Sequence, residues 1–144
     1  MPIKSLAVFC GSKTGKNPLF LQHASELGLL CASHGIRVIY GGGSVGIMGA
    51  VADETMRHGG AVTGVIPQVL VDWERQHNHL SQLLVVDNMH TRKKKMYDLC
   101  DAAVVLPGGF GTLDELFEMV TNTSSRISNK CRMKAFFMKK PKNV

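Results

Sequence analysis

Short apolar runs alternate with stretches of helical periodicity along most of the chain. The runs are the length of buried strands and lie at residues 3–9, 36–40, 61–66, 83–86 and 102–106. The stretches between them predict helices at about 18–34, from the glycine-rich segment 41–49 to 57, at 89–100 and at 111–121. Strictly alternating strands and helices are typical of a parallel sheet with helices on both faces. We therefore predict an α/β protein with a Rossmann-like, doubly wound parallel sheet.

Two glycine-rich turns follow predicted strands, and each leads into a helix. Residues 41–49 read GGGSVGIMG and residues 107–112 read PGGFGT. Glycine lets the backbone approach a ligand closely, and a helix N-terminus adds free N–H groups and a partial positive charge. Ligands of parallel sheets bind beyond the carboxyl ends of the strands, where both turns fall. We therefore expect a phosphate site at residues 107–112, where the Thr112 hydroxyl can also donate, and a second polar site at Gly42, Gly43 and Gly46. Tight strand-to-helix packing without a ligand is the alternative for the first turn.

Two charged side chains are the candidates for chemistry beside these turns. Glu115 lies four residues after Gly111, on the same face of the last predicted helix, so its carboxylate can point toward the ligand. A carboxylate next to a phosphate is better suited to act on a sugar, because like charges repel. Arg92 follows a predicted strand at the start of the basic helix and could hold a phosphate or ribose oxygen through its guanidinium. Complementing a helix dipole and forming a solvated basic face are the structural alternatives.

Composition divides the 144 residues unequally. Residues 121–144 hold seven of the 17 basic side chains and no acidic one, which leaves ten basic against 11 acidic groups in the rest. We therefore predict one Rossmann-like catalytic domain over residues 1–121 and a basic tail over 122–144. Because the positive charge belongs to the tail, we expect no nucleic-acid partner for the domain.

The remaining features favour an ordinary cytoplasmic protein. No apolar run approaches the length of a membrane span, and the N-terminal residues lack a signal-peptide layout, so we expect no membrane partner. The four cysteines form no CxxC pair and are interpreted as reduced, mostly buried thiols. His77 and His79 lack further ligands at metal-binding spacing, so no metal site is predicted.

At this point the motifs resemble those of a known family. Residues 107–115, PGGFGTLDE, match the PGGxGTxxE motif of the LOG ("Lonely Guy") family of cytokinin-activating phosphoribohydrolases, whose older label is lysine decarboxylase. Residues 89–93, MHTRK, are similar to the family's MHxRK element, and residues 41–49 to its GGGxxGxMG loop. The resemblance covers residues 3–121.

The resemblance implies an activity and a set of site residues. The implied reaction is hydrolysis of the N-glycosidic bond of AMP or an N6-modified adenosine 5′-monophosphate, giving a free base and ribose 5-phosphate. Arg92 and Glu115 would be the catalytic pair. The expected substrate-binding residues are Gly42, Gly43, Gly46, Glu74, Arg92, Lys93, Gly108, Gly109, Phe110, Gly111, Thr112, Leu113, Asp114 and Thr121.

The resemblance also implies a homodimer whose active sites use residues from both subunits, and no cofactor. Cleaving an N-glycosidic bond builds positive charge on the ribose, which a carboxylate can stabilise without a metal or redox group. The decarboxylase label does not suit the sequence, because amine-forming decarboxylation commonly needs a Schiff-base cofactor and no lysine stands in a recognisable cofactor context.

The tail departs from the family pattern after about residue 121. We expect the family to continue with a further helix and strand, but residues 122–144 have little periodicity and an abrupt change of charge. We interpret the domain as truncated or altered there, which would leave the fifth strand as an exposed sheet edge and lower stability or activity. A non-catalytic nucleotide-binding module is the alternative function on this reading.

Overall fold

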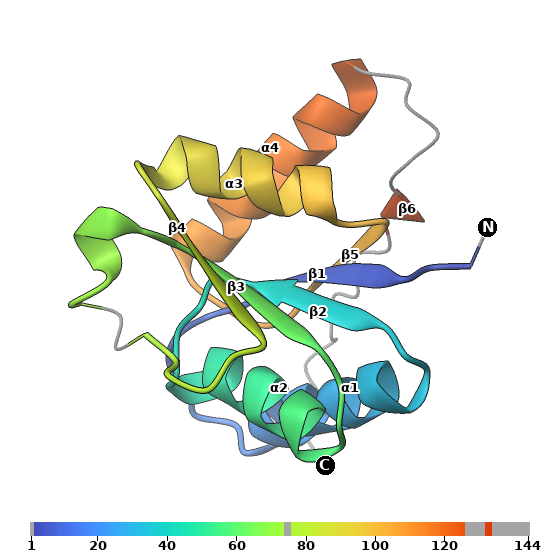
Figure 1. Cartoon of the computed structure of the whole chain (residues 1–144). Coiled ribbons are helices and arrows are strands. Elements are labelled where there is room, and N and C mark those ends of the chain that lie inside the picture. Colours follow the sequence, from blue (N-terminus) through green and yellow to red (C-terminus); the bar gives the residue numbers. More distant parts are fainter. Residues whose placement is uncertain (1, 74–75, 126–131, 134–144) are drawn as a thin grey trace, which may run out of the picture.

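The computed structural model describes residues 2–73, 76–125 and 132–133, and its centre is a parallel β-sheet (Figure 1). The strands run in the spatial order β4-β3-β2-β1-β5-β6, and every pairing between neighbours is parallel. They are β1 (Ser5–Phe9), β2 (Arg37–Tyr40), β3 (Val62–Pro67), β4 (Gln82–Val86), β5 (Ala102–Val105) and β6 (Arg132–Met133). The predicted doubly wound sheet is confirmed.

Helices cover both faces of the sheet (Figure 1). In that view α1 (Leu19–Ser33) and α2 (Gly46–Arg57) lie below the sheet, and α3 (Met89–Leu99) and α4 (Phe110–Ser125) lie above it. A short 3₁₀ helix, η1 (Gln68–Leu70), follows β3. The predicted helices are all present, but α4 is longer than predicted and continues past residue 121 to Ser125.

The strand residues alternate between two cores, because successive side chains of a strand point to opposite faces. On β2, Val38 and Tyr40 join the core shared with α1 and α2, whereas Ile39 joins the core beneath α3 and α4. On β1, Val8 belongs to the first core, and Phe9 to the second. All five are almost completely buried, as expected for a sheet covered on both faces.

The β1–β5 pairing joins segments that are far apart in the sequence. The carboxylate of Asp101, at the start of β5, accepts hydrogen bonds from the N–H groups of Lys4 and Ser5 at 2.9 and 3.1 Å. The Ser5 hydroxyl donates to the same oxygen at 3.0 Å. This clasp fixes the register in which Leu6 stands beside Ala102.

The prediction that β5 would be an exposed edge is wrong for its first half. Ala102 and Ala103 pair with Arg132 and Met133 of β6, which lies in the segment that lacked a recognisable pattern. A two-residue strand is too short for periodicity to reveal. The other tail residues, 126–131 and 134–144, lie outside the described part of the chain, and the proposed division at residue 121 stays a prediction.

Two further observations concern the cysteines and the apolar character of the helices. Cys10, Cys31 and Cys100 are free and buried, as predicted, while Cys131 lies outside the described residues. Among the helices of the described segments, none is long and apolar enough to cross a membrane.

Candidate active site

The candidate site lies beside β1, the strand from which the chain adds later strands on both sides of the sheet. From β1 the chain passes to β2 on one side, and β5 later pairs on the other side, so the loops after β1 and β5 separate at the carboxyl edge. Such a switch point is the usual ligand site of an open parallel sheet. A pocket of about 520 Å³ occupies it, lined by the loop after β1, the first turns of α2 and α3, and residues of the turn and helix between Pro107 and Glu115.

The loops after β1 and β5 meet through two glycines. The Gly11 N–H donates to the Pro107 carbonyl at 3.1 Å. A Cβ on Gly11 would lie 3.1 Å from Gly108 Cα, and a Cβ on Gly108 would overlap the Thr112 hydroxyl. Glycine at positions 11 and 108 is therefore explained by packing within the protein.

Gly109 and Gly111 need a different explanation. Both line the pocket, and within the described part of the chain a Cβ at either position would meet no atom within 4 Å. Neither has a φ in the left-handed region that favours glycine. The space beside these two residues, next to the start of α4, is open to a ligand that approaches the backbone closely.

The first glycine turn is packed against the protein itself. The N–H groups of Ile47 and Met48, at the start of α2, donate to the carbonyls of Lys13 and Gly11 at 3.5 and 3.3 Å. Gly46 has φ +66°, and a Cβ there would overlap the Ser12 carbonyl oxygen. The packing alternative thus accounts for this geometry.

Ile47 and Met48 line the pocket, whereas Gly42, Gly43 and Gly46 do not belong to its described lining. Their substrate-binding role stays a prediction.

Arg92 lies at the end of the first turn of α3 and is held by a backbone carbonyl. Asn88 begins this helix by accepting the Thr91 N–H on its side-chain oxygen at 2.9 Å. The Arg92 side chain is only 2% exposed, and its Nη2 donates to the Gly41 carbonyl at 2.9 Å. A Cβ on Gly41 would overlap this nitrogen, so the glycine makes room for the guanidinium. Arg92 lines the pocket from this fixed position.

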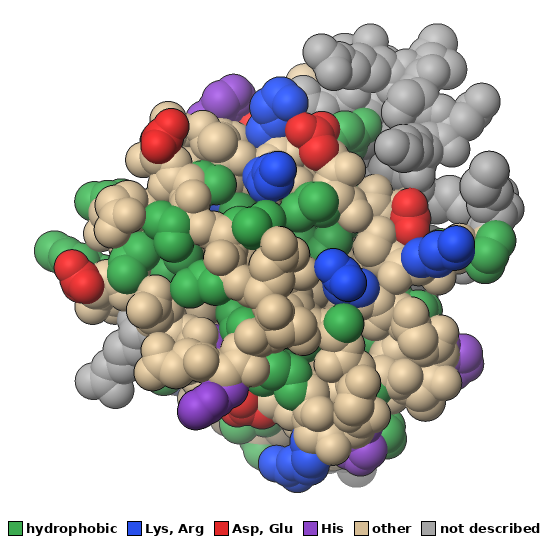
Figure 2. All heavy atoms as spheres, in the orientation of Figure 1, with side chains coloured by type: hydrophobic (Ala, Val, Ile, Leu, Met, Phe, Trp, Pro, Cys, Tyr) green, Lys and Arg blue, Asp and Glu red, His purple; other side chains and the backbone are tan. Residues whose placement is uncertain are grey.

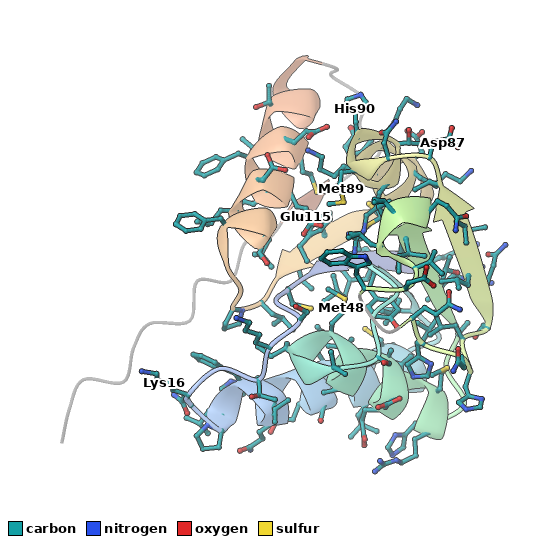
Figure 3. All side chains as sticks on the ribbon, turned by 90° about the vertical axis from the view of Figure 1, so that its left-hand side faces the viewer. Lys16, Met48, Asp87, Met89, His90 and Glu115 are labelled. Carbon is teal, nitrogen blue, oxygen red and sulfur yellow. The ribbon has the colours of Figure 1, made fainter. Side chains whose placement is uncertain are left out.

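Glu115 reaches the same pocket from α4. Figure 3 shows Glu115, Met89 and Met48 coming from α4, α3 and α2 toward one space. At the sheet end of this space lies the buried thiol of Cys10, whose pKa is raised to about 12. Burial is the main cause, the Glu115 charge raises it further, and the Arg92 charge lowers it. Glu115 and Arg92, the two predicted catalytic residues, therefore shift the pKa of Cys10 in opposite directions.

Several predicted substrate-binding residues lie away from the described pocket lining. Phe110 is 91% exposed, and Leu113 is also exposed. Lys93 and Asp114 form an ion pair with each other at 2.9 Å. The Thr121 hydroxyl donates to the Phe117 carbonyl at 2.9 Å. Glu74 lies outside the described residues, and the substrate-binding roles of all these residues stay predictions.

The structure adds pocket residues that sequence reasoning did not select. Ser12 and Lys13 lie in the loop after β1 and bring a hydroxyl and a positive charge to the pocket, and Met89 contributes from α3. The signal for Ser12 and Lys13 was the polar turn after the first strand, because a central strand at a switch point contributes its loop to the ligand site.

His77 is buried and lies beside an acidic side chain of α2. It is 7% exposed, and its Nε2 lies 2.7 Å from Asp53 Oδ1 on α2. Its Nδ1 accepts the His79 N–H at 3.1 Å, so the ring proton is on Nε2 and is donated to Asp53. This pair fastens the segment after η1 to α2. In the described residues, no group of three or more histidine, cysteine or acidic side chains is placed to hold a metal ion.

The fold and the pocket together define a Rossmann-like α/β protein with a ligand site at the switch point of its sheet. Residues 48–137 match the model of a protein family described as "Possible lysine decarboxylase". The chain belongs to this family, the LOG family that its motifs resemble.

Curated relatives carry names that are more specific than the family label. The chain is 41% identical over 128 residues to a cytokinin riboside 5′-monophosphate phosphoribohydrolase of Rhodococcoides fascians, with 88% of this chain and 65% of the relative covered. It is 44% identical over 119 residues to the protein of that name, LOG7, of Arabidopsis thaliana, with 82% and 54% covered. The chain thus spans between about half and two thirds of the length of these relatives.

Solved structures share the fold at low sequence identity. The molybdenum cofactor binding protein of Rippkaea orientalis superposes with a TM-score of 0.75 at 20% identity, covering 95% of this chain and 79% of that one. The Moco carrier protein of Chlamydomonas reinhardtii gives a TM-score of 0.71 at 19% identity, covering 92% and 89%. At these identities the likeness concerns the fold alone.

Proposed function

We propose that this protein hydrolyses the N-glycosidic bond of AMP or an N6-modified adenosine 5′-monophosphate, releasing the free base and ribose 5-phosphate. The observation that carries the proposal is one pocket that combines an open glycine turn with a fixed Arg92 and with Glu115. Its volume of about 520 Å³ is within the range of small-molecule sites. The names of the curated relatives support the same reaction.

The open turn suits the phosphate end of the substrate. Gly109 and Gly111 leave room for phosphate oxygens beside the start of α4, where free N–H groups and the helix dipole favour an anion. Thr112, which is buried and lines the pocket, adds a hydroxyl. Gly108 supports this arrangement by letting the turn pack against Thr112 and Gly11.

The reaction places the sugar next to Glu115. As the bond between C1′ and the base nitrogen breaks, its electron pair leaves with the base and positive charge develops on the ribose. The Glu115 carboxylate stabilises that charge. A water molecule adds to C1′ and loses one proton, and the departing base takes up one proton. Arg92, held by the Gly41 carbonyl, binds an oxygen of the ribose phosphate and keeps the sugar facing Glu115.

Release of free base, followed by chromatography, tests this proposal. Incubation with AMP and with isopentenyladenosine monophosphate is expected to yield adenine or isopentenyladenine. Glu115→Gln and Arg92→Ala are each expected to lower the rate by about 10² to 10³, the range typical of losing one group that stabilises charge in the transition state. Glu26→Gln on α1, whose carboxylate accepts from Gln22 at 2.9 Å, is the matched control and should leave the rate unchanged.

Two outcomes would contradict the proposal. Full activity in Glu115→Gln would remove the carboxylate from the reaction. Calorimetric binding of AMP without any base release by the unaltered protein would instead support a non-catalytic nucleotide-binding module.

We also propose that a second copy of this chain covers α4. Phe110, Leu113, Phe117 and Val120 are 91%, 42%, 65% and 40% exposed. Their spacing of three, four and three residues places them along one side of the helix. An apolar stripe on a single helix can meet its own copy across a two-fold axis. Because Glu115 is on the same helix, such a dimer would bring partner residues close to the pocket.

A cytoplasmic location is the last part of the proposal. It is supported by the free thiols of Cys10, Cys31 and Cys100, because oxidising compartments favour disulfides. Cell fractionation with an antibody against the protein tests it.

A further inference from the structure

Lys93 connects α3 to α4 through two carboxylates. Its Nζ lies 2.9 Å from Asp114 Oδ2 and also pairs with Glu118. Asp114 and Glu118 are four residues apart on α4 and therefore share one face of that helix. The Lys93 side chain is 15% exposed and that of Glu118 is 23% exposed, so these two groups are partly shielded from water, whereas the Asp114 side chain is 64% exposed.

The ion cluster lies next to the two predicted catalytic residues in the sequence of each helix. Lys93 is the immediate neighbour of Arg92 on α3, and Asp114 is the immediate neighbour of Glu115 on α4. The cluster thus joins the two helices beside the two groups proposed to act on the substrate. Toward the sheet, α3 and α4 share apolar contacts in the core that contains Met96 and Met119.

We propose that Lys93 is a positioning residue that sets the separation of Arg92 and Glu115 across the pocket. This inference rests on the proposed function for its kinetic consequence. Lys93 is outside the described pocket lining, and its ammonium group is engaged by two carboxylates. Without it, Asp114 and Glu118 would repel each other and α4 would lose its ionic contact with Lys93.

The electrostatics of the cluster agree with a permanently charged lysine. The pKa of Lys93 is raised above its ordinary value, first by the hydrogen bond with Glu118 and then by that with Asp114. Burial acts in the opposite direction and is outweighed. His90, at the start of α3, places its Nδ1 3.4 Å from Glu118 and is a second contact between the two helices.

Lys93→Met tests the inference because it removes the charge and keeps most of the side-chain length. A shift of a catalytic group by about 1 Å can lower a rate by up to about 100-fold, so we expect kcat with AMP to fall by about 10- to 100-fold with little change in KM. A direct substrate ligand would give the opposite pattern, a raised KM.

The charge exchange Lys93→Glu with Glu118→Lys provides the rescue. It keeps one positive group between two carboxylates, since Lys at 118 would face both Glu at 93 and Asp114. We expect it to recover most of kcat. A substrate-binding lysine could not be rescued in this way, so loss of AMP affinity in both variants would overturn the inference.

Lys94→Met is the matched control. Lys94 is the next residue of α3 and pairs with Asp98 at 2.9 Å, within the same helix and in water. Figure 2 shows basic and acidic side chains side by side over α3. Because the Lys94 pair does not join two helices, its loss should leave kcat and KM unchanged.

Hydrogen exchange separates this inference from the proposed function. In Lys93→Met, amide exchange in the first two turns of α4 should accelerate relative to both the unaltered protein and Lys94→Met, with or without activity. If the unaltered protein releases no base, the proposed function fails, and the exchange result alone decides whether Lys93 holds α4. Unchanged exchange in both Lys93→Met and Glu118→Gln would overturn the positioning role, and Glu118→Gln covers the case in which Lys93→Met does not fold.

Discussion

At the scale of single residues, the glycines beside the pocket differ in what fills the space of a missing Cβ. At Gly108 that space holds the Thr112 side chain, and at Gly46 it holds the Ser12 carbonyl. At Gly109 and Gly111 it is open within the described part of the chain. Packing therefore explains the first pair, whereas the second pair leaves room for the proposed phosphate.

This difference predicts that alanine lowers stability at position 108 and weakens ligand binding at position 109. Gly108→Ala should lower the free energy of unfolding by about 1–3 kcal/mol, because the new methyl group overlaps Thr112. Gly109→Ala should leave stability nearly unchanged and weaken AMP binding, because the methyl group enters the proposed phosphate site. Thermal unfolding and calorimetric titration of both variants measure this. Unchanged AMP affinity in Gly109→Ala would place the phosphate elsewhere.

Some features of the site could be predicted from the sequence, and others could not. Arg92 and Glu115 could be selected from sequence because each stands at a fixed distance from a strand end. The hydrogen bond from Arg92 to Gly41 and the ion pair from Lys93 to Asp114 join residues 51 and 21 positions apart. Such contacts depend on how helices pack, which no local pattern records.

At the scale of elements, α4 has two faces with different tasks. One face brings Thr112 and Glu115 to the pocket, and Leu116 and Met119 are buried. The other carries the exposed stripe that includes Phe110 and Phe117. An isolated helix of this kind would expose a large apolar area to water, which soluble proteins usually cover with a partner.

Phe117→Lys should therefore convert a dimer into a monomer. A charge in the middle of an apolar helix contact is costly to bury without a partner. Light scattering after gel filtration measures the molar mass. Leu30→Lys on α1 is the control, because Leu30 is 55% exposed and lies outside the stripe. A monomeric unaltered protein, or a dimeric Phe117→Lys, would contradict the proposed contact.

The elements themselves were largely predictable because strand and helix patterns are periodic. Apolar runs located β1 to β5 within one or two residues. Helix α1 begins one residue from its predicted start, and the Asn17 side chain accepts the Leu19 N–H there at 3.0 Å. The end of α4 and strand β6 were missed. Charge changes sharply near residue 121, but helical hydrogen bonding continues to Ser125 regardless of composition.

At the scale of the whole molecule, buried thiol and phenol groups make the stability of the fold depend on pH in the alkaline range. Burial raises the pKa of Cys10 to about 12 and that of Cys31 to about 11, from 9.0 in both cases. Burial also raises the pKa of Tyr40, whose hydroxyl donates to the Gly43 carbonyl at 2.8 Å. The folded state thus holds these protons more tightly than the unfolded state does.

The sign of the pH effect follows from this difference. Below about pH 9 both states are protonated at the two thiols and stability is at its full value. Between about pH 9 and 12 the unfolded state loses protons that the folded state keeps, so stability falls as pH rises. Thermal unfolding midpoints at pH 7 to 11 should decline above pH 9, and Cys31→Ala should flatten the decline. An equally steep decline in Cys31→Ala would contradict the role of that thiol.

The Asp101 clasp has a consequence for the order in which the protein forms. It joins residues 4 and 5 to residue 101, so β1 keeps one edge without β5 until at least 105 residues have been synthesised. A chain emerging from the ribosome can complete β1, β2 and β3 first, but an unpaired strand edge is open to association with other chains. The pocket needs the loops after both β1 and β5, and it is therefore assembled only after the long-range pairing closes. Binding capacity should appear late in folding, with no active intermediate before it.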